Sequence, residues 1–265
     1  DLISHKIECD ILTEESLLKE QELTTQGVSI RYNVHGLDKE EFQDIASISA
    51  PSADQIQWIH WSRLEVSPAL LAVFNTHKFH ALIAEDIINT SSRIKIEELD
   101  DSLIVSTKIP VLDTTENELV LKHFCIVLKK NCVISFSEIP LSLFSDLHRR
   151  LGSPKRRIRK RGADYLFWAI LDVLADYNTL FAESLAEQLD GLEAQLINAN
   201  KELSLSTIHN ARTMITQFHR MAHPCRDIAS RLTRTDSNLI TKESRLFFRD
   251  LFDHASQTVE STEYL

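Results

Sequence analysis

The 265-residue chain is short of glycine and proline, the two residues that most often mark turns. It has 5 glycines, about 2% where ~7% is usual, and 6 prolines. This scarcity predicts few turns and long helices, and it argues against a many-turned β-sandwich. Neither G-x-G-x-x-G nor G-x-x-x-x-G-K occurs, so a Gly-rich nucleotide-binding loop is not expected. The G-x-S-x-G motif is also missing, and hydrolase chemistry has no support.

Positive charge is in deficit as well, because 29 Lys and Arg face 39 Asp and Glu, for a net charge of −10. Phosphate binding needs a positive surface, so nucleic acid is not an expected partner, whereas an acidic surface attracts cations. No C-x-x-C pair is formed by Cys9, Cys125, Cys132 and Cys225, which we expect to be reduced thiols of a cytosolic protein. No run of 18 apolar residues and no signal peptide is visible, so we expect the chain taken alone to be soluble.

Residues 1–162 have a mixed α/β pattern. Helical patterns are predicted over 39–48, 68–74 and 140–151, and Lys129 to Asn131 is predicted to turn between two apolar strands. Strands are predicted over 28–34, 57–61, 93–96, 103–111, 119–128 and 132–136. The segment 149–161 holds eight Lys or Arg and no acid. It is either a site for phosphate or anionic lipid or a solvated helix face and linker, and the lack of interleaved aromatic residues favours the second.

From Ala163 to the end the pattern is helical, in three long segments over about 163–200, 203–235 and 240–265. We therefore divide the chain into an α/β part (1–162), a long acidic helix pair (163–239) and a last helix (240–265). No glycine, proline or cap ends the last pattern before Leu265, which predicts a helix that continues in a longer chain.

The first long helix is predicted to carry an acidic face. At 100° per residue, five carboxylates fall within roughly 60° of one another; they are Asp172, Asp176, Glu183, Glu187 and Asp190. No Lys or Arg occurs between Gly162 and Asn200. Like charges at i, i+4 cost about 0.2–0.5 kcal/mol per pair, so either cations or a basic partner offsets them or the face is simply solvated.

Two i, i+4 pairs in the later helices are candidate metal ligands. Asp250 and His254 project from one face of the last helix, with Asp253 on the flank, a spacing that places two ligands together but is also common by chance. His219 and His223 have the same spacing near Cys225, which makes a zinc site conceivable. Pro224 is expected to interrupt that helix, however, and no third imidazole is close in sequence, so surface or interface histidines are favoured there.

Several motifs occur together and in order, and this series resembles the cytoplasmic domain of the CorA family of divalent-cation (magnesium and cobalt) transporters. The resemblance spans roughly residues 55–265. The motifs are WIHWSRL (58–64), FHALIAEDIIN (79–89), RIKIEELDDSL (93–103), NCVISFSE (131–138), ADYLFWAILD (163–172) with DY (176–177), HPCRD (223–227) and FRDLFDH (248–254).

The resemblance implies an α/β/α sandwich, with a mixed sheet flanked by helices, followed by long helices and a stalk helix that leads to membrane spans absent here. It also implies a homopentameric funnel on the cytoplasmic side of the inner membrane, and no enzymatic activity. The residues that match the family's regulatory Mg²⁺ sites are Glu85, Asp86, Asp172, Asp250 and His254. In the family, Asp86 of one subunit would lie near Asp250 of the next, and bound Mg²⁺ would favour the closed pore.

Hard cations prefer carboxylate oxygens and retained waters, which suits this set of residues, although Co²⁺, Zn²⁺ or Ni²⁺ fit the same sites. One departure is that His80-Ala81-Leu82 stands where the family usually has His-Pro-Leu. The alternatives are the zinc-transporting branch, which commonly lacks the Glu85–Asp86 pair, a soluble oligomeric scaffold that keeps the fold, and a metal-dependent enzyme. The first 50 or so residues match nothing in the family.

Overall fold

The computed structural model describes residues 11–23, 27–42, 51–62, 64–66, 68–139, 141–197 and 205–263. The strands are β1 (Gly27–Tyr32), β2 (Leu37–Phe42), β3 (Ile56–Trp61), β4 (Lys95–Glu98), β5 (Leu103–Asp113), β6 (Glu118–Lys129) and β7 (Cys132–Ser137). The α-helices are α1 (Glu14–Leu23), α2 (Pro68–Thr76), α3 (Ala81–Ile88), α4 (Ser145–Gly152), α5 (Ala163–Ile197), α6 (Leu205–Arg234) and α7 (Arg245–Glu263). The described residues also form the short 3-10 helices η2 (Leu141–Phe144) and η3 (Arg157–Lys160).

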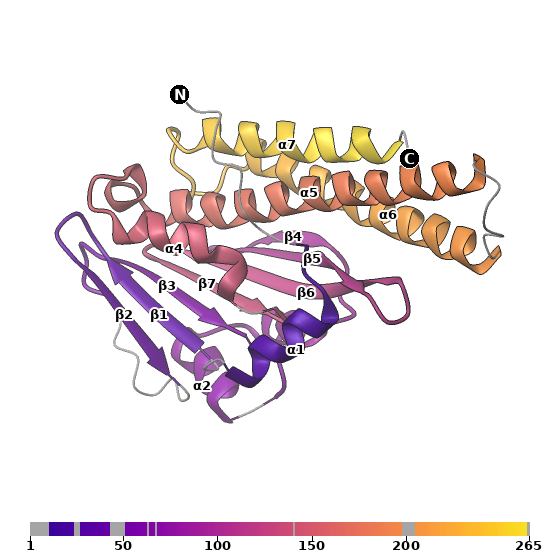
Figure 1. Ribbon diagram of the computed structural model, residues 1–265. Coiled ribbons are helices and arrows are strands. Elements are labelled where there is room, and N and C mark those ends of the chain that lie inside the picture. The colour runs from indigo at the N-terminus through magenta and orange to yellow at the C-terminus, as the bar shows by residue number, and fades with distance from the viewer. Residues whose placement is uncertain are drawn as a thin grey trace.

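The strands form one seven-stranded mixed sheet in the order β2-β1-β3-β7-β6-β5-β4. Only the central pair, β3 and β7, is parallel, and the other neighbours are antiparallel. The turn predicted at Lys129 to Asn131 is confirmed, because Lys129 pairs with Cys132 across a two-residue connection. Helices cover both faces, so the predicted α/β class with a mixed, helix-flanked sheet is confirmed (Figure 1).

The two faces of the sheet have separate cores, which follows from the period of two along a strand. Trp58 and Val133 point to the face covered by α5, α6 and α7, whereas Trp61 and Ile134 point to the face covered by α2 and α3. All four side chains are buried. Anything on α3 therefore lies on the opposite side of the sheet from anything on α5.

The long helices are longer than those of an average domain, as the scarcity of glycine predicts, with 35 residues in α5 and 30 in α6. Helix α7 begins at Arg245 and not near residue 240, because 235–244 form a loop that caps α5 through Asp164 and Thr241. The expected break at Pro224 is wrong, since α6 continues through it. A proline removes one helical hydrogen bond, and the packing of α6 on α7 and β6 offsets that loss.

Within the described ranges, none of the helices has the length and apolar content needed to cross a membrane. The sheet and the long helices share one hydrophobic cluster. The division of the chain at residues 162 and 239 stays a prediction.

The helix expected over 39–48 is wrong for residues 39–42, which belong to strand β2, and 43–50 lie outside the described residues. The charged strand pairs with β1, where Arg31 forms ion pairs with Asp38 at 2.6 Å and Glu40 at 3.3 Å. Cross-strand pairing therefore overrides the local helical pattern. Helices α1 and α3 were not predicted, whereas the helix expected over 68–74 is confirmed as α2.

Candidate metal site

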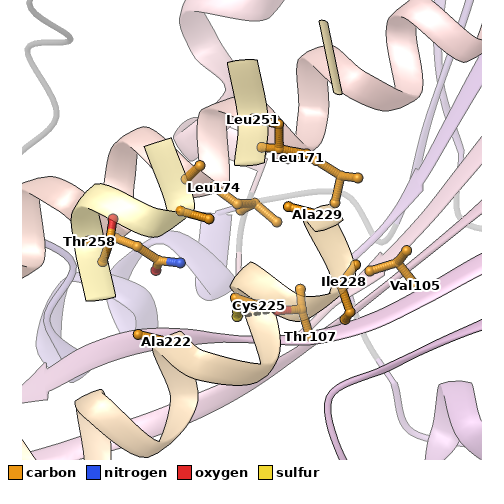
Figure 2. Close-up of a pocket in the computed structure, with 13 residues that line it drawn as sticks. Val105, Thr107, Leu171, Leu174, Ala222, Cys225, Ile228, Ala229, Leu251 and Thr258 are labelled. Atoms are coloured by element: carbon orange, nitrogen blue, oxygen red, sulfur yellow. Dashed lines mark hydrogen bonds between the residues drawn. The ribbon is translucent and has the colours of Figure 1, made fainter. Parts of the chain in front are cut away.

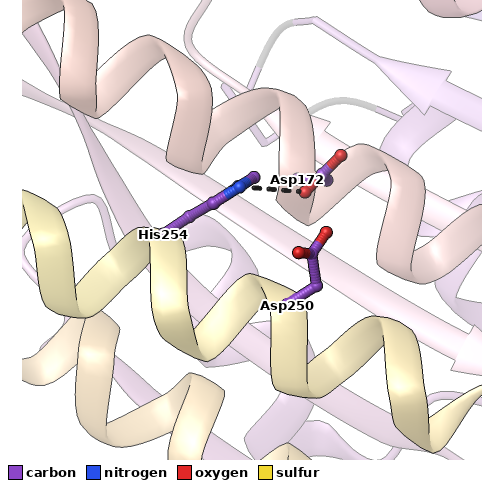
Figure 3. Close-up of side chains that lie close together, drawn as sticks. All are labelled: Asp172, Asp250 and His254. Atoms are coloured by element: carbon purple, nitrogen blue, oxygen red, sulfur yellow. Dashed lines mark ion pairs between the residues drawn. The ribbon is translucent and has the colours of Figure 1, made fainter. Parts of the chain in front are cut away.

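The neighbouring helices α5 and α7 bring together three of the five predicted ligands. Helix α7 buries Phe248, Leu251 and Ala255 against the long helices. This stripe turns Asp250 and His254, one turn apart, toward α5. Asp172 faces them from α5, so the acidic stripe of α5 meets the polar flank of α7 (Figure 3).

Asp172, Asp250 and His254 each offer one ligand atom, and these atoms all lie within 4.8 Å of one another. The His254 Nδ1 atom lies 3.6 Å from Asp172 Oδ1 and 3.6 Å from Asp176 Oδ1. Asp172 is mostly covered, with its side chain 15% exposed, whereas Asp250 is exposed. The cluster therefore has a mostly covered carboxylate on one side, Asp172, and an exposed one on the other, Asp250.

The electrostatics of the cluster show which group balances the acidic face. The contact with Asp172 raises the pKa of His254 to about 9, against the opposing effect of its partial burial. Burial, and then the charge of Asp172, raises the pKa of Asp176 to about 6. At neutral pH a protonated imidazole thus lies between two carboxylates. Repulsion among the carboxylates of the acidic face is therefore partly offset by a positive charge from the chain itself, that of His254.

Two atoms of the cluster fit an additional ligand. Asp172 Oδ1 and His254 Nδ1 are buried, and at 3.6 Å their ion pair is longer than a hydrogen bond, which leaves both atoms without one among the described residues. Buried polar atoms without partners are rare and costly, and a metal ion is one of the groups that satisfies them. Two carboxylates with one imidazole are a mixed O/N donor set, which suits Mg²⁺ with retained water and also Co²⁺, Ni²⁺ or Zn²⁺. A metal that binds His254 would first displace its proton.

The structure does not bring Glu85 and Asp86 to this cluster. Both lie on α3, whose Ile83 and Ile87 are buried on the opposite face of the sheet. Asp86 Oδ2 instead pairs with Lys95 Nζ at 2.7 Å, and the backbone carbonyl of Asp86 contacts His123 Nε2 at 3.1 Å. The hydrogen bond to Asp86 raises the pKa of Lys95. Within one chain, the five predicted ligands therefore form two separate groups.

The sequence interpretation missed two side chains that bear on these groups. Asp176 was placed on the acidic face but not in the site, although its 40° offset from Asp172 put it beside that residue. Lys95 belongs to the motif at 93–103, which by itself assigns no role to this residue. No local pattern links it to Asp86, because the sheet and α3 bring the two together.

Arg159 joins the basic segment (149–161) to the rest of the fold. Arg159 is buried, and it donates from Nε to the Asn33 carbonyl at 2.6 Å and from Nη1 to the Leu151 carbonyl at 2.8 Å. Its neighbours Lys155, Arg156 and Lys160 are exposed. This arrangement supports a solvated linker that Arg159 attaches to the end of β1.

A small cavity of about 50 Å³ lies where α5, α6 and α7 meet β5 (Figure 2). Leucine, isoleucine, valine and alanine side chains form most of its lining. The Cys225 thiol lies at this cavity, 3.4 Å from Thr107 Oγ1, and therefore points toward the sheet. None of the described side chains that line the cavity is a carboxylate or an imidazole, so it is not the metal site.

The same fold occurs in solved structures of other proteins. The structure superposes on the soluble domain of CorA from Methanocaldococcus jannaschii with a TM-score of 0.73 and 17% identity, covering 89% of this chain and 91% of that one. It also resembles the ZntB cytoplasmic domain from Vibrio parahaemolyticus, with a TM-score of 0.65 and 14% identity over 89% of this chain and 90% of that one. At such identities the likeness shows the fold alone.

The chain belongs to the family described as CorA-like Mg²⁺ transporter protein, which matches residues 53–265. The cobalt/magnesium transport protein CorA of Thermotoga maritima is 27% identical over 206 residues, which are 78% of this chain. The chain spans 59% of the length of that relative. The resemblance drawn from the motifs is confirmed, and the family is one of transporters and not of enzymes.

Proposed function

We propose that this chain is the cytoplasmic, Mg²⁺-sensing domain of a CorA-like magnesium and cobalt transporter, a homopentamer in the inner membrane. Divalent cations bound between subunits favour the closed pore. The observation that carries the proposal is the Asp172, Asp250 and His254 cluster, in which two of the three ligands stand on α7 and can report its position.

The two groups of ligands on each subunit support a site shared between subunits. Asp86 and Asp250 lie on opposite faces of the sheet, so one chain cannot bridge them. In a ring, the α3 face of one subunit meets the α7 face of the next, and Asp86 joins the partner subunit's Asp250 around a common ion. Lys95 pairs with only one oxygen of Asp86, and the carboxylate keeps a second oxygen for the ion.

Binding of the ion would be linked to the equilibrium between the closed and the open states of the pore. Mg²⁺ takes one or two carboxylates and retains waters, which gives a weak site that suits millimolar concentrations. When Mg²⁺ leaves, the carboxylates of neighbouring subunits repel one another and the open states gain population. The imidazole of His254 and the likeness to the ZntB fold favour the zinc-transporting branch as a second candidate.

The test is limited proteolysis of the chain across a Mg²⁺ titration, with the mass measured in parallel by light scattering. Wild type should be protected or assemble in the millimolar range, and Asp250→Ala should lose that response. Asp253→Ala is the matched control, because Asp253 is exposed on the same helix but outside the cluster.

Three other outcomes would change the assignment. Protection by micromolar Zn²⁺ with no effect of Mg²⁺ would favour the zinc branch. An unaltered Mg²⁺ response in Asp250→Ala would remove the cluster from the sensor. Constitutive assembly that neither ion alters would favour an oligomeric scaffold.

A further inference from the structure

His219 and His223 form a second imidazole cluster, outside the acidic site. Both lie on α6, one turn apart, and their Nε2 atoms are 3.0 Å from each other. The ring planes are 80° apart, with centroids separated by 4.4 Å. The two side chains are partly buried, so solvent reaches them. The helix continues through Pro224, and the i, i+4 register of the pair is therefore intact.

The surroundings orient the lone pair of His219. The Thr262 hydroxyl on α7 lies 2.9 Å from His219 Nδ1 and 2.7 Å from the Val259 carbonyl, which can only accept. The single hydroxyl proton is donated to that carbonyl, so Thr262 accepts from His219 Nδ1–H. The Nε2 atom of neutral His219 consequently carries a bare lone pair, and it lies 3.0 Å from His223 Nε2. Metal-binding histidines are oriented in this way, by a hydrogen bond from the other ring nitrogen.

The separation of the two nitrogens fits a shared metal ion. With metal–nitrogen bonds of about 2.05 Å, nitrogens 3.0 Å apart subtend an angle of about 94° at the metal, close to octahedral. A tetrahedral angle needs them only roughly 0.3 Å farther apart. In the metal-free pair the Nε2–H of His223 donates to Nε2 of His219. When a metal enters, that proton on His223 moves to its Nδ1 through water, and both Nε2 lone pairs become ligands.

We propose that His219 and His223 form a two-imidazole site for a borderline divalent transition metal such as Zn²⁺, Co²⁺ or Ni²⁺, with water in the remaining positions. Imidazole suits these ions, whereas Mg²⁺ prefers oxygen, so the site discriminates against Mg²⁺. Cys225 is not a ligand, because its thiol faces Thr107. Thr262 is eight residues beyond His254, about 12 Å along α7, which separates this site from the acidic cluster.

Zn²⁺ and Co²⁺ binding would be measured by calorimetry and by the visible spectrum of bound Co²⁺, with millimolar Mg²⁺ present throughout. In a His254→Ala background, which removes the imidazole of the acidic cluster, one equivalent should bind. Adding His219→Ala or His223→Ala to this background should abolish the binding of that equivalent. His209→Ala is the matched control on the same helix, with an exposed imidazole, and should bind as the parent does. Thr262→Val keeps both ligands but removes the orienting hydroxyl, and should weaken binding about 10–100-fold.

A measurement on the wild-type chain tests the proposal even if one of the variants fails to fold. In imidazole ¹⁵N spectra of the wild-type chain, Zn²⁺ should shift the Nε2 signals of both His219 and His223, and Mg²⁺ should not. Unchanged signals, or equal binding in His219→Ala and the parent, would mean that the pair is only a hydrogen bond. These outcomes are independent of the Mg²⁺ response of Asp250→Ala, so the two proposals fail separately.

Discussion

His60 lies in the sheet against the rings of Trp58 and Phe144 and beside the hydroxyl of Ser135. Its Nδ1 lies 2.8 Å from Ser135 Oγ, which also accepts from Trp58 Nε1 at 2.9 Å. Ser135 thus contacts both the indole of Trp58 and the imidazole of His60, whose residue is only 2% exposed. Burial lowers the pKa of His60 to about 3. Since an unfolded histidine has a pKa near 6.5, this residue favours the folded state above that pH and opposes it as the pH falls.

The first prediction concerns this pH dependence. Between about pH 4 and 6 the unfolded state carries one more proton at His60, so the free energy of unfolding should rise with pH by up to about 1.4 kcal/mol per unit from this residue. His60→Gln should remove that part of the slope, measured by urea unfolding at several pH values. His35→Gln, at an exposed histidine, should keep the slope. An unchanged slope in His60→Gln would show that the residue titrates normally.

Cys125 and Cys132 give a second residue-scale prediction. Both thiols are buried, and burial raises the pKa of each to about 12. Because only the thiolate reacts, alkylation by iodoacetamide at pH 8 should be slow in the folded chain and fast in urea. Peptide mass spectrometry measures the difference. Cys125, Cys132 and Cys225 are free thiols, and Cys9 lies outside the described residues.

At the scale of elements, Asp164 joins the start of α5 to the loop before α7. Its Oδ2 accepts from the Thr241 amide at 2.9 Å and the Thr241 hydroxyl at 2.7 Å, and its Oδ1 accepts from the Tyr165 amide at 2.9 Å. The carboxylate is buried at a helix N-terminus, where negative charge is favourable. This contact sets where α7 begins, and so helps to place Asp250 against α5.

Asp164→Asn should lower the free energy of unfolding by about 1–3 kcal/mol, because charge-assisted hydrogen bonds to buried groups are replaced by weaker ones. Urea denaturation measures the change. Asp190→Asn, at an exposed position of the same helix, should change the free energy of unfolding by less than about 0.5 kcal/mol. Equal effects of the two variants would contradict the joining role of Asp164.

At the scale of the whole molecule, the sheet separates the two groups of predicted ligands. In a background without Cys9 and Cys225, Asp86→Cys and Asp250→Cys chains should form a covalent dimer under oxidation only when mixed. A disulfide needs Cα atoms within about 7 Å, and the sheet prevents this within one chain. Non-reducing electrophoresis gives the result. In the control mixture, Asp190→Cys replaces Asp250→Cys. An equal yield of covalent dimer in the two mixtures would argue against the proposed contact.

Local geometry could be predicted from the amino-acid sequence of this protein. The apolar runs predicted the strands that became β5, β6 and β7, and helical periodicity placed Asp250 beside His254, because both periods depend only on the backbone. The motif series identified the family and hence the candidate ligands.

Which of these residues contact one another depends on the packing of the whole fold. His254 contacts Asp172 from a position 82 residues later, Lys95 pairs with Asp86 through the sheet edge, and Thr262 orients His219 across two helices. Strand β2 likewise exists because β1 lies beside it. Such contacts depend on how apolar faces far apart in the sequence pack together, and no short-range pattern in the chain encodes that packing.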